Sequence, residues 1–144
     1  MEIEDAILNL SNQDESIRSQ AIDICSKFQT HEFFDIDVFK KLSNPNSEQG
    51  IRIFAFNSLI SIFQNEWSKI PQQEKNNISI LFPFHNTNDI TDSKFFSFAS
   101  QCVAAYLAFV GNESDITNFI KTYNADHSIY FSSFLTHFIL FLFD

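Results

Sequence analysis

Residues 51–63 decide the fold, and they read Ile51-Arg52-Ile53-Phe54-Ala55-Phe56-Asn57-Ser58-Leu59-Ile60-Ser61-Ile62-Phe63. Six apolar residues in this stretch recur with the spacing of one buried helical face: Ile51, Phe54, Ala55, Leu59, Ile62 and Phe63. The segment before it, Ser43 to Ser47, is rich in turn-forming residues, and Ser47 is of a type that caps helices. The stretch therefore predicts a long amphipathic helix that begins just after Ser47.

The same arrangement, with a small residue in the middle of the apolar face, occurs at two further places. Residues 17–28 and 95–106 align with residues 51–62 and put Ala21 and Ala99 where that stretch has Ala55. A fourth copy begins at Phe131, with Leu135 in place of the alanine. The copies begin 34, 44 and 36 residues apart, which is the range of two-helix solenoid repeats. Because a small residue lets a neighbouring helix pack closely, we expect the three alanines to be buried.

Shorter helical patterns lie between these copies, near residues 31–42, 71–82 and 113–123. Long and short helices thus alternate as the A and B members of helical hairpins. The chain contains only 2 Gly and 3 Pro, too few for the many tight turns of a sandwich or barrel. The sequence predicts an all-α fold: a superhelix of about four helical hairpins, truncated, in which residues 1–144 form a single solenoid segment.

Start and stop signals divide these helices from one another. A first short helix carries Ile3, Ala6, Ile7 and Leu10, and Phe34, Val38 and Leu42 should face inward from the third. The expected signals are Asn12 with Glu15 as a capping box, Thr30 opening the third helix, Pro71 at a first helical position, a loop over 82–89, Asp92 as a cap, Gly111 as a stop, Asn112 with Asp115 as a start, and Ser128 opening the last helix.

The charge balance limits the kinds of partner that the chain can bind. Its formal net charge is −9, and a free-standing phosphate-binding surface needs clustered Lys and Arg, so we expect no such surface here. The acidic character can serve solubility, or it can provide a receptor for basic protein surfaces. The sequence leaves both readings open.

Residues that could support catalysis or metal binding have simpler structural explanations. The pairs Asp14/Glu15 and Asp35/Asp37 lie at helix starts, where negative charge favours the helix dipole. Ser132, Ser133 and His137 only superficially resemble a nucleophile and its base. Cys25 and Cys102 fall on apolar faces, and no Cys/His group has zinc spacing. We expect no enzymatic activity, no metal and no cofactor.

Targeting signals give two further expectations. The acidic N-terminus lacks the apolar stretch of a signal peptide. The most apolar segment, residues 129–143, is too short and too polar for a membrane span, so we expect no membrane insertion. Its pattern runs to Asp144 without a cap, which suggests that this is the N-terminal part of a longer chain.

One part of the sequence resembles a known family. The stretch from Gly50 to Ile78, with Ile51-Arg52-Ile53-Phe54-Ala55 followed by Trp67-Ser68-Lys69-Ile70-Pro71, resembles the exportin branch of the β-karyopherins in its second HEAT repeat. The opening, with Ser16-Ile17-Arg18 before Ala21, is similar to the family's first repeat. In length and layout the first seventy residues look most like the tRNA exportin, with the exportin of leucine-rich signals next. Physically, the Trp can fill a corner between helices while the Pro fixes the start of the next helix.

The resemblance implies a function and a set of partners. Exportins are nuclear transport receptors with HEAT-like repeats that shuttle between nucleus and cytoplasm through the pore, where they meet nucleoporins. They bind the small GTPase Ran in its GTP form and carry cargo, here tRNA or protein. The resemblance implies Ran contacts from the B helices near 31–42, 71–82 and 113–123. Lys75 and Asn76, on the second of these, are the candidate partner-binding residues.

Two other functions remain as alternatives. The first is a generic HEAT-type scaffold for protein interactions that does not bind Ran. The second is a helical enzyme, which the missing catalytic motifs disfavour. For Lys75 and Asn76 the plainer interpretation is a solvated helix face.

Overall fold

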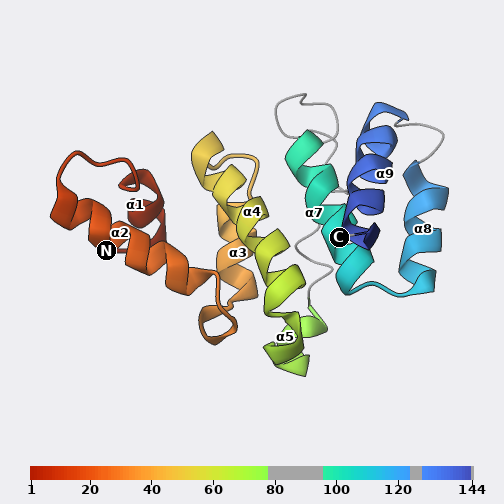
Figure 1. Ribbon diagram of the computed structural model, residues 1–144, viewed down its shortest axis with the longest axis horizontal. Helices are drawn as coiled ribbons and strands as arrows, with labels where there is room; N and C mark the ends of the chain where they lie inside the picture. Colours follow the sequence, from red (N-terminus) through yellow and green to blue (C-terminus); the bar gives the residue numbers. More distant parts are fainter. Residues whose placement is uncertain (78–95, 124–127, 144) are drawn as a thin grey trace. The chain divides into compact units, whose positions relative to one another are not determined.

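The computed structural model describes residues 1–77, 96–123 and 128–143, and throughout these ranges the fold is all-α without any strand (Figure 1). The chain divides into two compact units, Met1–Leu81 and Phe82–Asp144. The first contains α1 (Ile3–Leu8), α2 (Glu15–Phe28), the 3₁₀ turn η1 (His31–Phe33), α3 (Ile36–Leu42), α4 (Gln49–Asn65), η2 (Trp67–Lys69) and α5 (Gln72–Lys75). The second contains α7 (Phe96–Phe109), α8 (Glu113–Tyr123) and α9 (Ser128–Phe143).

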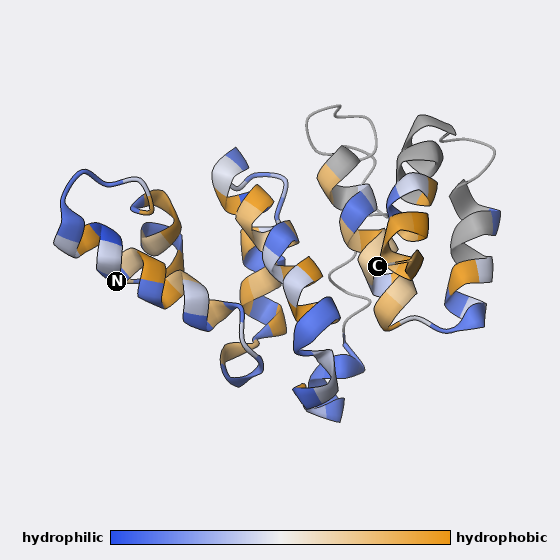
Figure 2. Ribbon diagram, viewed as in Figure 1, coloured by the Kyte–Doolittle hydropathy of each residue, from blue (hydrophilic) through white to orange (hydrophobic). Residues whose placement is uncertain are grey.

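The core of the first unit is the apolar face that the repeat pattern predicted on α4. Ala55, Leu59 and Ile62 are at most 1% exposed. An aromatic cluster joins this helix to its neighbours: the ring of Phe28 lies 4.6 Å from Phe39 and 6.0 Å from Phe54, measured between centroids. Figure 2 shows apolar residues on the helices of this unit, with polar residues on other faces of the same helices. Burial of this face against α2 and α3 stabilises the unit.

The predicted small residues are partly confirmed. Ala21 and Ala55 have no exposed surface, while the side chain of Ala99 lies outside the described residues. Ile17 was expected on the buried face of α2, yet 37% of it is exposed. Helical spacing assigns a residue to a face, but it does not say how far the neighbouring helices extend along that face. Phe34 and Leu42 are buried as expected, and Val38 is half-buried.

Replacing Ala55 with leucine is expected to lower the free energy of unfolding by about 1–3 kcal/mol, because a fully buried site has no room for a larger side chain. Urea titration followed by the fluorescence of Trp67, the single tryptophan, measures the change. Asn57→Leu places the same residue on the exposed side of α4 and serves as the control. Equal stability of the two variants would show that Ala55 is not at a close helix crossing.

Helix α2 begins two residues later than a cap at Asn12 requires. The carboxylate of Asp14 accepts the N–H groups of Ser16 and Ile17 at 2.9 and 3.2 Å, so Asp14 is the N-cap. Asn12 instead accepts the N–H of Asp14 and shapes the preceding turn. The predicted capping box is therefore wrong, because an aspartate nearer the helix satisfies its first-turn donors.

The predicted helix over 31–42 is divided into η1 and α3. Phe34 and Asp35 are extended, and the Asp35 carboxylate accepts the N–H groups of Asp37 and Val38, which starts a new helix at Ile36. Thr30 precedes η1, but its hydroxyl donates back to the Lys27 carbonyl oxygen and caps nothing after it. The second cap was available in the sequence, since an Asp followed by an apolar helical face is a start signal.

Two other helices begin one residue later than predicted. Glu48, without a side-chain cap, precedes α4, and the hydroxyl of Ser47 donates to the Lys41 carbonyl oxygen at 3.0 Å instead. Pro71 is the residue before α5, whose first helical residue is Gln72. Helix α5 is described only over four residues, and the expected helix to 82, the loop over 82–89 and the cap at Asp92 lie outside the described residues.

In the second unit α7 packs against α9, and the rings of Phe109 and Phe141 lie 5.5 Å apart. Asn112 and Asp115 form the predicted start of α8: each side chain accepts the other's backbone N–H, at 2.9 and 3.1 Å. Ser128 is the first residue of α9, as expected. Gly111 follows the end of α7 without a positive φ; a Cβ there would meet Leu107 at 3.0 Å, so close packing favours glycine.

No helix within the described ranges has the length and apolar character needed to cross a membrane.

Candidate protein-interaction surface

Trp67 fills the corner between α4 and α5. It lies in η2, and its ring meets Phe63 of α4 edge-on at 5.4 Å and Phe34 at 6.5 Å. Ile70, at the end of this turn, is 4% exposed, and Pro71 then leads into α5. Edge-to-face aromatic pairs of this kind add to the stability given by burial. The packing of Trp67 and Ile70 therefore determines where α5 begins relative to the end of α4.

The two predicted partner-binding residues lie at the end of α5 and differ in their surroundings. The Lys75 ammonium nitrogen is 5.5 Å from the centre of the Trp67 ring, a distance typical of a cation–π contact, and the residue is half-buried. Asn76 is exposed, and its side-chain oxygen accepts a hydrogen bond from Gln72 at 2.9 Å. Asn76 is therefore open to a partner, whereas Lys75 also takes part in the corner.

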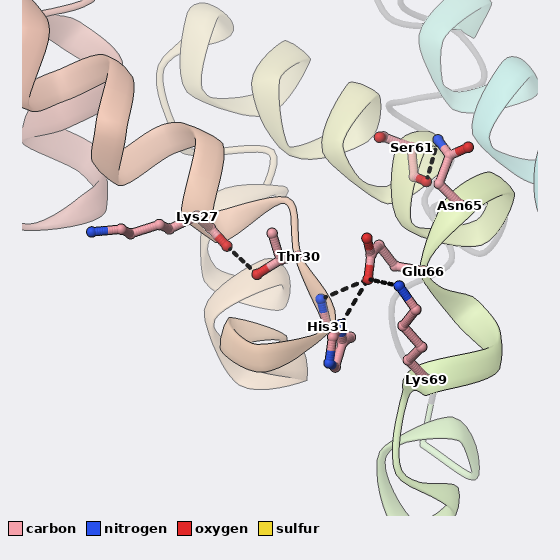
Figure 3. A network of polar contacts seen from close by, with 7 residues as sticks. All are labelled: Lys27, Thr30, His31, Ser61, Asn65, Glu66 and Lys69. Carbon is pink, nitrogen blue, oxygen red and sulfur yellow. Dashed lines mark hydrogen bonds and ion pairs between the residues drawn. The ribbon is translucent and has the colours of Figure 1, made fainter.

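A polar network joins η1 to the end of α4 (Figure 3). One oxygen of the Glu66 carboxylate lies 2.7 Å from Nδ1 of His31, accepts the His31 backbone N–H at 3.4 Å, and is 3.8 Å from the Lys69 ammonium. The side-chain hydrogen bond from His31 is the main reason that the pKa of Glu66 lies below its ordinary value. The network ties η1 to the turn at the end of α4.

A second polar link lies beside it. The amide of Gln29, at the end of α2, donates to the hydroxyl of Ser58 on α4 at 3.0 Å. Ser58 has no exposed surface, so this bond satisfies a polar group inside the core. Sequence reasoning missed both links, because their partners are 29 and 35 residues apart and belong to no local motif.

Replacing Glu66 with glutamine is expected to make stability less sensitive to acid. A carboxyl group whose folded-state pKa is depressed contributes stability that is complete above its unfolded pKa and is lost as the pH falls through the folded value. For Glu66 this loss begins as the pH falls below the ordinary value of 4.5. Thermal unfolding midpoints, measured from neutral pH downward, should therefore fall less steeply for Glu66→Gln.

Glu32→Gln is the matched control for this measurement. Glu32 is exposed, and the described part of the chain gives it no ion pair. Its variant should keep the acid dependence of the unchanged protein. If Glu66→Gln and Glu32→Gln give the same slope, the His31–Glu66 bond does not contribute to folding.

The groups considered for catalysis are placed as follows. Cys25 and Cys102 are buried free thiols, and burial raises the pKa of Cys102 to about 12, which keeps it a protonated and weak nucleophile. Burial lowers the pKa of His137, and the side chains of Ser132 and Ser133 lie outside the described residues. Within the three described ranges, no three His, Cys, Asp or Glu residues are grouped to hold a metal ion.

An apolar, uncharged face is exposed on α9. Its large side chains Leu135, Ile139, Leu140, Leu142 and Phe143 are between 37% and 86% exposed. Contiguous exposed apolar side chains are typical of surfaces that bind other macromolecules.

Comparisons with family models, with curated proteins and with solved structures give no match to this chain.

Proposed function

We propose that this chain is a protein-binding segment of an exportin-type nuclear transport receptor, in which HEAT-like helical hairpins build a superhelix and bind Ran in its GTP form. The proposal is based on the resemblance to exportins at Arg52, Trp67 and Pro71. The observation that supports it best is the corner at Trp67, where the ring packs between Phe63 and Phe34 ahead of α5. A rigid corner of this kind holds α5 in a defined direction, as a B helix that presents a partner surface requires.

The partner surface in this proposal is α5 with Lys75 and Asn76. Asn76 is exposed and offers both a donor and an acceptor. Selectivity for one nucleotide state requires contacts with Ran segments that move on hydrolysis. A surface with equal affinity for both states cannot distinguish between them. Cargo, tRNA or protein, and nucleoporins would bind elsewhere on the receptor, which would shuttle between nucleus and cytoplasm. The chain has no catalytic role in this proposal.

The second candidate is a generic helical scaffold for protein interactions without Ran binding. One observation favours it: the Lys75 ammonium already lies over the Trp67 ring, so part of its charge serves the fold and not a partner. In this candidate the corner only positions neighbouring helices.

Binding of this chain to Ran–GTP, with variants on α5, tests the proposed surface. Asn76→Ala and Lys75→Gln should each weaken binding, whereas Gln73→Ala, which changes an exposed residue on the same helix, should not. Circular dichroism and Trp67 fluorescence check that each variant stays folded. If Gln73→Ala weakens binding as much as the other two, the assignment to Lys75 and Asn76 is wrong.

A further inference from the structure

An apolar groove opens on the first unit, and its lining includes neither Lys75 nor Asn76. Its walls come from three elements: Ile3 of α1, Ile24, Lys27 and Phe28 of α2, and Phe33 of η1. Phe28 is nearly buried, whereas Phe33 is 53% exposed and forms part of the rim. The lining is almost wholly apolar.

The volume of the groove suits one large side chain. It measures about 200 Å³, and a cavity of roughly 150 Å³ lined by similar residues is large enough to bind benzene. A Phe or Leu side chain therefore fits, while a folded helix face with several anchors does not. The groove is also open to solvent, so an occupant can reach it from outside.

The charges near the groove decide which residues are favoured on either side of the apolar anchor of a bound peptide. Lys27 lies in the wall, but its ammonium is 2.8 Å from the Asp23 carboxylate. Lys41 is similarly paired with Glu4, at 3.2 Å. Two exposed carboxylates remain beside wall residues in the sequence, Glu2 next to Ile3 and Glu32 next to Phe33, and no ion pair is given to either within the described ranges.

We propose that this groove binds a single large apolar side chain from a basic peptide segment of a partner protein. The apolar anchor enters between Ile3, Ile24 and Phe33, and Lys or Arg residues on either side of the anchor meet Glu2 and Glu32. The net charge of −9 on the whole chain also attracts a basic segment. The same net charge repels an acidic segment. This site shares no residue with α5, the helix that carries Lys75.

Fluorescence anisotropy with short labelled peptides tests the proposal. The probe has one Phe flanked by Lys residues; a second peptide has Ser in place of Phe, and a third has Glu in place of Lys. The first should bind saturably, and the other two should bind roughly tenfold or more weakly, since a buried Phe and the paired charges each favour the complex. Methyl signals of Ile3 and Ile24 should shift on binding, whereas those of Ile36 and Ile62, in the core, should not.

Two protein variants form a matched pair for the same measurement. Phe33→Ser removes a wall residue that is 53% exposed, and Ile22→Ser removes one of similar exposure, 49%, that is outside the groove. Phe33→Ser should weaken binding of the Phe peptide roughly tenfold, and Ile22→Ser should leave it unchanged. The double variant Glu2→Gln with Glu32→Gln should also weaken binding and reduce its salt dependence.

Four results would overturn the proposal. Equal binding of the Phe and Ser peptides would mean that charge alone attracts the probe. Equal or tighter binding of the Glu-flanked peptide would reverse the charge assignment. Equal loss in Phe33→Ser and Ile22→Ser, or no saturable binding at all, would show that the groove is not a site.

Discussion

Replacing Phe39 with alanine is expected to lower the free energy of unfolding of the Met1–Leu81 unit by about 3–5 kcal/mol. Phe39 has no exposed surface, and its ring lies 4.6 Å from Phe28 and 5.5 Å from Phe34. Removal of the ring leaves a cavity at the point where α2, η1 and α3 meet. Because proteins of this size are stable by only about 5–15 kcal/mol, the loss is a large share of the total.

Trp67 fluorescence during urea unfolding measures this effect, since the Trp67 ring contacts Phe34 of the same aromatic cluster. Phe33→Ala is the control: it removes the same ring from the neighbouring element, but from a site that is 53% exposed. Its cost should stay below about 1 kcal/mol. Similar losses in the two variants would contradict the core described for this unit.

Replacing Arg52 with alanine should lower the free energy of unfolding by about 2–3 kcal/mol. Arg52 is only 4% exposed, its Nε donates to the Ser43 carbonyl oxygen at 3.2 Å, and its guanidinium lies 5.8 Å from the centre of the Phe56 ring. The alanine variant removes a charged donor from the carbonyl group that follows α3, and it also removes packing. Both losses fall on the turn that joins α3 to α4.

Arg18→Ala is the matched control for this prediction. Arg18 makes a bond of the same kind, from Nη1 to the Asn12 carbonyl oxygen at 2.7 Å, but it is only half-buried. Water can replace that bond, so the cost should be clearly smaller. Urea titrations of both variants give the comparison. If Arg18→Ala is the more destabilising, burial does not control the contribution of these two arginines.

Apolar spacing predicted the helical character of the segments that the structure describes, and several core positions. The pattern around Ala55 and Leu59 identified α4 and its buried face, because apolar residues that recur about every 3.6 positions fit a helix and not a strand. The exact starts were harder to predict, since neighbouring side chains compete for the same first-turn N–H groups. Asp14 caps α2 where Asn12 was expected, and Asp35 begins a helix inside a segment read as continuous. The arrangement of the helices as a HEAT-like superhelix, with residues 1–144 as one segment, stays a prediction.

The candidate surfaces were less accessible to sequence reasoning. Lys75 and Asn76 were named from their place after Trp67 and Pro71, but the contact between Lys75 and the Trp67 ring depends on how the corner closes. The bond between His31 and Glu66 joins residues 35 positions apart, so no local pattern contains it. Phe33, which lines the groove, belongs to η1, and the chain is extended after it where the sequence predicted one continuous helix.

Calorimetric titration of this chain with Ran, loaded in turn with a non-hydrolysable GTP analogue and with GDP, tests the proposed function most directly. We expect binding to the GTP form to be tighter by about tenfold or more, within the usual range of coupling between two ligands. The preference should decrease in Asn76→Ala and persist in Gln73→Ala. Equal affinity for the two forms, or no affinity for either, would contradict the transport-receptor proposal and favour a generic helical scaffold.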